Sequence, residues 1–174
     1  MKKYLALTVC GVIVFSVFFI ALRFACDNIG VSANKLEEDI RSSQKIADDW
    51  TVTGEVSDTM AAYISYPEDK SDSTFSVYIK HSGLSFGYFF RAGGSIGEID
   101  DGILALTSES LNERAFISMN AQKIARLEVD NGIEVKTINF DSEKPFAIVL
   151  PVNAGELRFY DVNGNIIKYH EQKF

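Results

Sequence analysis

The chain has 174 residues, of which 47% are hydrophobic and 24% are charged, and its formal net charge is −7. This length suits one domain with an appendage, and 13 Phe and 7 Tyr supply a core, which excludes a disordered chain. Two His and two Cys exclude a dense metal cluster and a disulfide framework.

The charges are distributed unevenly along the chain. Three basic residues and no acidic residue precede Asp27, whereas the 14 basic and 24 acidic residues from there onward give a net charge of −10. A surface this acidic repels phosphate groups, so we expect no nucleic acid partner. The charge is typical of a domain kept soluble by its surface, and cationic partners stay open.

An uncharged run of 19 residues, Tyr4 to Leu22, follows Lys2 and Lys3. As a helix with a rise of about 1.5 Å per residue it would be about 28 Å long, close to the ~30 Å hydrocarbon core of a bilayer. The run exceeds the 7–15 apolar residues of a cleavable signal, and no convincing pair of small residues ends it. The sequence therefore predicts that residues 1–26 form a retained signal anchor, a single transmembrane helix that makes the membrane a partner.

Lipidation of Cys26 is the alternative to a retained signal anchor. Ala25 precedes Cys26, as in lipoprotein signals, but Arg23 stands where those signals carry Leu. The tail before the apolar run is three residues long, and so short a tail is rarely translocated ahead of a large domain. We therefore expect a cell-membrane protein with its C-terminal domain outside the cytoplasm.

Residues 27–48 are predicted to form a linker and a short stalk helix. Asn34 and Glu37 have the spacing of an N-cap and its N3 carboxylate, which predicts a helix that extends to about Ala47. The apolar positions form a narrow stripe of Leu36, Ile40, Ala47 and Trp50.

Residues 49–174 show apolar and polar residues in alternation, the pattern of half-buried strands. The predicted strands are Trp50–Val56, Met60–Tyr66, Phe75–Ile79, Leu84–Arg91, Ile103–Thr107, Arg114–Met119, Ile124–Val129, Ile133–Asn139, Phe146–Leu150, Glu156–Asp161 and Asn165–Tyr169. Ala92–Gly102, with four Gly, is predicted to be a loop, and Pro145 and Pro151 favour an edge position for the strand between them. The expected fold is mainly β: an antiparallel β-sandwich, or a small barrel, outside the cytoplasm.

No pattern indicates an enzyme, and we assign no catalytic residue. Sortases need a Cys and a His in their β-barrel, but no Cys follows Cys26. His81 and His170 are expected at the surface. Signal peptidases carry a Ser-Met pair close after their anchor, whereas Ser118-Met119 lies deep in the domain within a strand pattern.

No cofactor or metal site is predicted either. The Gly-rich segment 93–97 lacks the Lys-Ser/Thr pair of a phosphate-binding loop. Glu98, Asp100 and Asp101 could offer oxygen ligands to calcium, but their spacing is unlike an EF-hand loop, so a solvated turn is the better interpretation.

An aromatic cluster stands out before this loop. Alternation places Phe86, Tyr88 and Phe90 on one face of a strand and Phe89 and Arg91 on the other. One face is expected in the core. For the second face we favour burial under another element over a binding surface.

The hairpin motifs of segment Phe116–Ile167 are Ile124–Val129, Asp130-Asn131-Gly132 and Phe159–Ile167. They resemble domains of uncharacterised, signal-anchored bacterial envelope proteins. The resemblance implies a small extracytoplasmic β-sandwich in the cell envelope, and it implies no activity, cofactor or site residue.

The expected function is that of a membrane-tethered, non-enzymatic binding or interaction module with an envelope protein partner. A pilin-like or pseudopilin subunit is an alternative, although Tyr4–Leu22 lacks the acidic residue that such helices carry, and Gly30 also counts against it. An envelope hydrolase is the third hypothesis.

Overall fold

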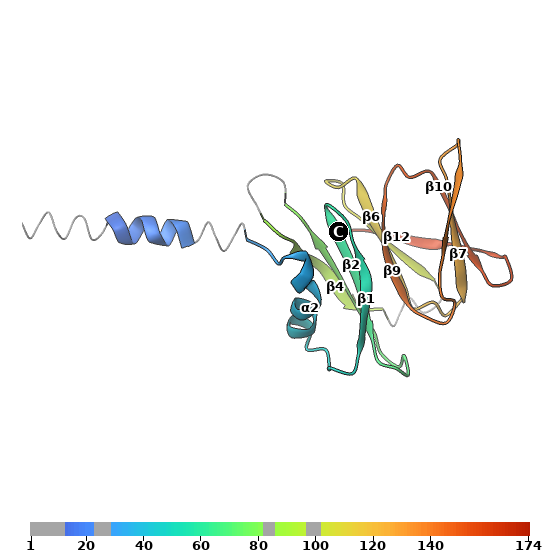
Figure 1. The fold of residues 1–174 in the computed structure, drawn as a ribbon, viewed down its shortest axis with the longest axis horizontal. Helices are drawn as coiled ribbons and strands as arrows, with labels where there is room; N and C mark the ends of the chain where they lie inside the picture. Colours follow the sequence, from blue (N-terminus) through green and yellow to red (C-terminus); the bar gives the residue numbers. More distant parts are fainter. Residues whose placement is uncertain (1–12, 23–28, 82–85, 97–101) are drawn as a thin grey trace, which may run out of the picture.

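The computed structural model describes residues 13–22, 29–81, 86–96 and 102–174. In these ranges the chain is mainly β, with antiparallel pairing between most neighbouring strands, which confirms the mainly β, antiparallel part of the predicted fold. Figure 1 shows a layered molecule in which α2 and three sheets follow one another along the long axis.

The strands form three sheets of four strands each within the described residues. The first sheet contains β1 (Thr51–Val56), β2 (Met60–Tyr66), β3 (Thr74–Ile79) and β4 (Phe89–Ser95), in that order. The central sheet contains β12 (Tyr169–Lys173), β5 (Ile103–Thr107), β6 (Glu113–Ser118) and β9 (Phe146–Pro151), in that order. The third sheet contains β11 (Ile166–Ile167), β10 (Glu156–Asp161), β7 (Ile124–Asp130) and β8 (Val135–Asn139), in that order.

The central sheet is covered on both faces, so the structure stacks three sheets where two were expected. On β5, Leu104 and Leu106 pack toward the first sheet, whereas Ile103 and Ala105 pack toward the third. All five residues of β5 are buried. A continuous apolar run such as Ile-Leu-Ala-Leu is typical of a strand that is buried on both sides.

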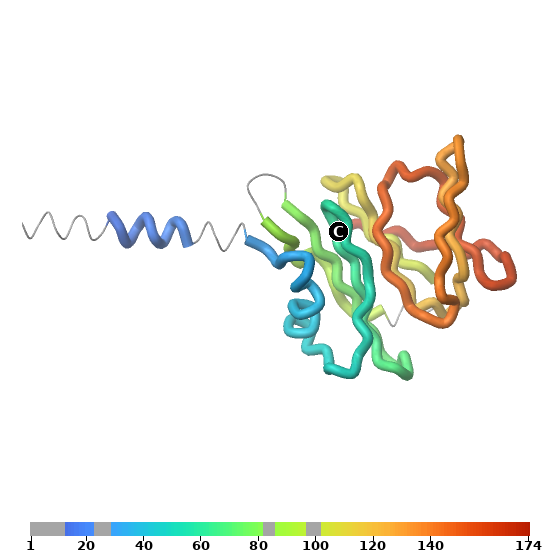
Figure 2. Tube along the Cα trace, in the orientation of Figure 1, coloured from blue at the N-terminus to red at the C-terminus, as the bar shows by residue number. Residues whose placement is uncertain are grey.

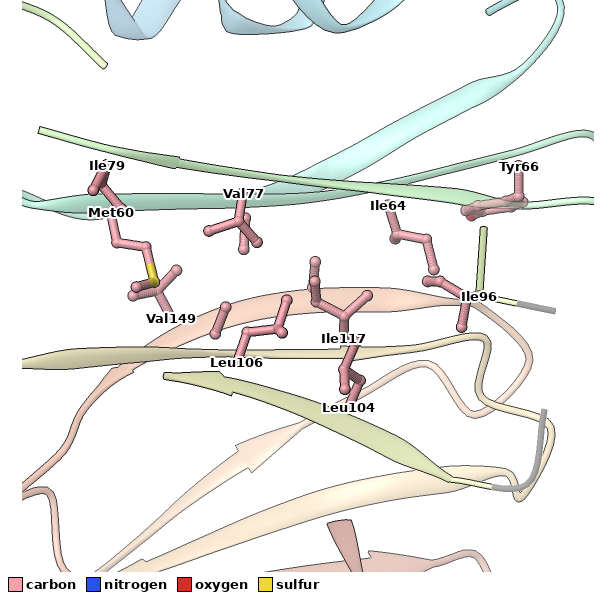
Figure 3. Packing of buried hydrophobic residues seen from close by; sticks show 13 residues of the cluster. Met60, Ile64, Tyr66, Val77, Ile79, Ile96, Leu104, Leu106, Ile117 and Val149 are labelled. Carbon is pink, nitrogen blue, oxygen red and sulfur yellow. The ribbon is translucent and has the colours of Figure 1, made fainter. Parts of the chain in front are cut away.

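The core between the first and central sheets is aliphatic. Figure 3 shows Met60, Ile64 and Val77 of the first sheet facing Leu106 and Ile117 of the central sheet. The core between the central and third sheets is aromatic: Phe116 lies 5.3 Å from Phe159 between ring centroids, and Phe140 stacks on Phe146 at 4.4 Å. Two separate cores thus hold the sheets together.

A helix covers the outer face of the first sheet. The 3₁₀ turn η1 (Ala33–Lys35) leads into α2 (Leu36–Gln44), whose fully buried Leu36 and Ile40 contact the sheet. The predicted helix exists, but Asn34 is not its N-cap, because the 3₁₀ turn occupies that position and begins after Ser32.

The Gly-rich segment was wrongly predicted as a loop from Ala92. Strand β4 continues to Ser95, and Gly93 and Gly94 pair with Ser76 and Phe75 of β3. A Cβ atom on Gly93 would lie 2.8 Å from the backbone oxygen of Phe75, so glycine is what permits this close approach.

The strand expected over Leu84–Arg91 also starts later, at Phe89. Before it, Phe86 and Tyr88 form isolated bridges with Ile29 and Val31, where the chain enters the domain.

The C-terminal segment forms two strands where one was expected. β11 pairs with β10 in the third sheet, and β12 crosses to the central sheet and runs parallel to β5. Figure 2 shows this last strand returning to the middle of the molecule. The prediction that Pro145 and Pro151 flank an edge strand is confirmed, since β9 is the outermost strand of the central sheet.

The N-terminal segment is described in part. Residues 13–22 are helical, and Phe15 and Phe19 lie one turn apart on this helix. Among the described residues, no helix has both the length and the apolar character needed to cross a bilayer. The rest of the predicted anchor, with Cys10 and Cys26, lies outside the described residues.

Candidate functional site

Ser118, the serine of the Ser-Met pair, is a structural residue. It is buried at the end of β6 and its hydroxyl donates to the carbonyl oxygen of Gly102 at 2.9 Å. The hydroxyl oxygen of Ser118 in turn accepts a hydrogen bond from the backbone N–H of Asn120 at 3.0 Å. Because its hydroxyl both donates and accepts, Ser118 stabilises the turn that leaves β6.

The two histidines lie on different sheets. The ring of His81, which follows β3, stacks on Phe89 with 4.1 Å between ring centroids. His170 is exposed on β12. In the described part of the chain no hydrogen bond connects His170 to Ser118.

The predicted calcium candidates Glu98, Asp100 and Asp101 lie outside the described residues. Within the described ranges, no group of three or more His, Cys, Asp or Glu side chains is arranged to hold a metal ion.

A shallow acidic cleft of about 630 Å³ lies at one end of the first sheet. It is lined by Asp49, Trp50, Pro67, Glu68, Asp69, Ser71 and Asp72. Asp69 accepts hydrogen bonds from the hydroxyl and the backbone N–H of Ser71, which lower the pKa of its carboxyl group. Asp72 accepts from the N–H of Ser73 at 2.7 Å. These two carboxylates therefore hold the turn between β2 and β3.

A polar cluster joins the first sheet to the central sheet. The carboxylate of Glu113 accepts hydrogen bonds from the hydroxyls of Ser57, at 2.5 Å, and Thr59. The backbone N–H of Ser57 donates to the carbonyl oxygen of Met60 at 2.8 Å. Because both hydroxyls belong to the β1–β2 turn, Glu113 connects this turn to the start of β6.

The aromatic cluster is divided by the fold. Tyr88 is buried and its hydroxyl donates to the carbonyl oxygen of Ser57 at 2.5 Å. Phe86 and Phe90, by contrast, are 68% and 54% exposed. The burial favoured from the sequence is therefore wrong for these two residues. The α2 helix covers Tyr88 but leaves them accessible.

The outer face of the third sheet carries paired charges. Arg158 of β10 lies opposite Glu128 of β7, and Tyr160 lies opposite Arg126. The guanidinium of Arg126 lies 4.2 Å from the centroid of the Tyr160 ring, a cation–π contact. Tyr and Arg in this arrangement are residue types that protein interfaces favour.

One edge of the third sheet is unpaired in the described structure. β8 is the last strand of the order β11-β10-β7-β8. The carbonyl of Glu134 and the N–H of Phe140 bond toward β7, so alternation directs the backbone groups of Val135, Thr137 and Asn139 outward. Ile133, 94% exposed, and Val135, 54% exposed, flank this edge.

The edge of β9, by contrast, is protected against pairing with another strand. The N–H of Val152 bonds to Asn112 on the β6 side, so the amides of odd-numbered residues face outward. Pro145 and Pro151 lack an N–H, and the side chain of Glu55 accepts the N–H of Val149 at 2.8 Å. One edge is thus blocked against pairing, and the β8 edge is left open.

Sequence reasoning missed the β8 edge as a candidate interaction site. The Asn131-Gly132 turn and the strand after it were recognised, but periodicity does not reveal which strands lie outermost. The one available signal was the apolar pair Ile133 and Val135 directly after the Asn131-Gly132 turn, in a strand without proline.

Comparisons with known proteins add no relative: no family model, curated protein or solved structure matches the chain.

Proposed function

We propose that the protein is a membrane-tethered, non-enzymatic binding module that holds its β domain outside the cytoplasm and contacts an envelope protein through the β8 edge. The open β8 edge is the observation that carries the proposal. The partner contributes an extended segment, because unpaired N–H and C=O groups along an edge are complemented by another strand.

The tether is supported by the sequence of the N-terminal segment. Tyr4 to Leu22 is uncharged, and residues 13–22 within it are helical. A helix satisfies its own backbone groups, which a bilayer requires. The third sheet lies at the end of the domain away from α2 (Figure 1), and the chain enters the domain just before α2, so a tethered domain would present β8 away from the bilayer.

Binding is supported by the contrast between the two edges. Glu55, Pro145 and Pro151 block β9, whereas β8 offers the outward backbone groups of Val135, Thr137 and Asn139 beside exposed apolar side chains. Backbone pairing supplies affinity in this mode, and the flanking side chains supply specificity.

The tether is tested on intact cells. Protease added outside should degrade the domain of residues 49–174, and mass spectrometry of the mature protein should find the apolar segment still attached. A domain that resists protease until the cells are lysed, or a mature chain that starts after Leu22 without lipid, would contradict the proposal.

The contact is tested with a photoreactive amino acid placed at Val135 of the full chain in its own membrane. We expect one envelope protein to be cross-linked, and we expect Thr137→Pro to abolish the adduct, because it removes an outward N–H without breaking a bond to β7. The photoreactive residue at exposed Lys45, at the end of α2, is the matched control.

Equal labelling from Val135 and Lys45, or an adduct that survives Thr137→Pro, would overturn the β8 contact. Adducts between copies of this chain would instead favour the pilin-like alternative.

A further inference from the structure

Two large apolar side chains are exposed where the chain enters the domain. Ile29 is 61% exposed and Phe86 is 68% exposed, and the two residues pair in an isolated parallel bridge. The N–H of Gly30 donates to the carbonyl oxygen of Phe86 at 2.6 Å, which fixes the two side chains in one place. We call Ile29 and Phe86 the entry corner.

Backbone contacts around the entry corner set its geometry. Val31 and Tyr88 exchange backbone hydrogen bonds of 2.7 and 2.8 Å next to it. Gly87 has a φ of +83°, and a Cβ atom there would lie 2.7 Å from the carbonyl oxygen of Val31. Only glycine fits this close crossing, so Phe86 is held outward by the backbone.

A cation lies over the ring of Tyr88, a neighbour of Phe86 in the sequence. The ammonium group of Lys80 is 4.8 Å from the centroid of the Tyr88 ring, and Tyr88 is bonded to Val31. Exposed apolar side chains and a lysine close to a predicted span are residue types that membrane interfaces favour.

The chain length places the corner close to the end of the apolar run. Seven residue steps separate Leu22 from Ile29, and a fully extended chain covers at most about 25 Å over them. The polar layer on each side of the hydrocarbon core is roughly 5–8 Å thick. A corner tethered this closely meets the layer at a high effective concentration, so even weak apolar contacts are populated.

We infer that the entry corner inserts into the headgroup layer of the membrane that holds the N-terminal segment, and thereby sets the orientation of the domain. The inference rests on the tether proposed above. Its occupant is the lipid surface, since the corner adjoins the predicted span. It gives the adjacent exposed side chains of Ile29 and Phe86 a function.

The test uses the full chain reconstituted in phosphatidylcholine vesicles that contain lipids brominated near the headgroup. Trp50 is replaced by Phe, and Phe86→Trp supplies a single probe at the corner. We expect its emission to be quenched about twofold or more and to shift to shorter wavelength, as for interfacial aromatic residues. Ile133→Trp in the same background is the matched control, exposed at the other end of the domain, and should show neither effect.

A second variant separates insertion from simple proximity. Ile29→Asp in the Phe86→Trp background should reduce the quenching to the level of the Ile133→Trp control, because a carboxylate resists burial in the headgroup layer. Flotation of the vesicles is measured on every sample.

The outcomes are distinguishable. A chain that fails to float with the vesicles overturns the tether and, with it, the inference. A Phe86→Trp chain that floats but whose indole emission is unquenched leaves the tether intact and overturns the inference. A shift to shorter wavelength without quenching means that protein covers the corner, either residues 23–28 or a second copy, and this also overturns it.

Discussion

At the scale of single residues, a buried tyrosine fastens the helix to the first sheet. Tyr78 is fully buried on β3, and its hydroxyl donates to the carboxylate of Asp39 on α2 at 2.6 Å. Burial, and then the bond to Asp39, raise the pKa of the Tyr78 hydroxyl well above its usual range. The folded state therefore disfavours loss of the Tyr78 proton.

This raised pKa predicts a loss of stability in alkali. Above pH 10, the ordinary pKa of tyrosine, the unfolded chain releases the proton and the folded chain retains it, so the free energy of unfolding falls as the pH rises. Tyr63 and Tyr66 also have raised pKa values and contribute in the same direction. We expect Tyr78→Phe to make the decline above pH 10 less steep.

The same variant should cost about 1.5–3 kcal/mol at neutral pH, because a hydrogen bond to a charged group is lost. Urea unfolding between pH 7 and pH 11 measures both effects. Tyr160→Phe, on the outer face of the third sheet, is the control and should leave both quantities unchanged. An equally steep alkaline decline in Tyr78→Phe would contradict the role of this hydroxyl.

The residue scale also shows where sequence reasoning fails. The spacing of Asn34 and Glu37 suggested a capping pair, but Asn34 instead accepts a hydrogen bond from the hydroxyl of Ser32 at 2.7 Å in the 3₁₀ turn. An Asn can serve a cap or a local turn equally well, and the choice depends on how the chain reaches the sheet.

At the scale of elements, the edges of the sheets differ in their protection. The central sheet ends at β9, where Pro145 and Pro151 remove two outward amides and Glu55 of β1 bonds to a third. This bond links the first sheet to the edge of the central sheet, so it contributes to stability and to solubility.

Glu55→Ala is predicted to lower the free energy of unfolding by about 1–2 kcal/mol, because the N–H of Val149 loses its partner. Glu55→Gln should be close to wild type, because the amide oxygen still accepts the hydrogen bond. Thermal unfolding, with sedimentation to detect self-association, provides the measurement. If Gln and Ala cost the same, the hydrogen bond is not what stabilises this edge.

The elements were largely predictable where periodicity is strong. Strands β2, β5 and β10 appear with the expected boundaries, because alternation or a continuous apolar run identifies them. Strand β4 extended beyond its prediction, since Gly93 and Gly94 are poor strand formers and pair here only because β3 lies beside them. The bounds of β4 therefore depend on its neighbour β3, and the local sequence does not reveal which strands become neighbours.

At the scale of the whole molecule, the central sheet couples two cores. Phe116 of β6 faces the aromatic core, and its neighbours Ala115 and Ile117 face the aliphatic one. A change in one core is therefore transmitted to the other through the same strand. We expect the three sheets to unfold as one cooperative unit.

Phe159→Ala, in the aromatic core, tests this coupling. The variant should lower the free energy of unfolding by about 3–5 kcal/mol, because a large buried ring is lost and a cavity remains. Trp50, next to β1 at the other side of the molecule, should report the same shifted midpoint in fluorescence as circular dichroism does for all strands. Ile133→Ala, at a 94% exposed side chain, is the control and should change the midpoint little.

Separate transitions, with Trp50 fluorescence unchanged while the circular dichroism midpoint moves, would show that the first sheet folds independently of the third.

By itself the sequence determined most of the strands, the short helix and the edge position between two prolines, because alternation, apolar runs and the missing N–H of proline are local properties. The tertiary structure decided that three sheets stack, that the last strand pairs in parallel, that Phe86 stays exposed and that the β8 edge stays open. These outcomes depend on which distant strand becomes a neighbour, and that is set by the joint burial of many side chains.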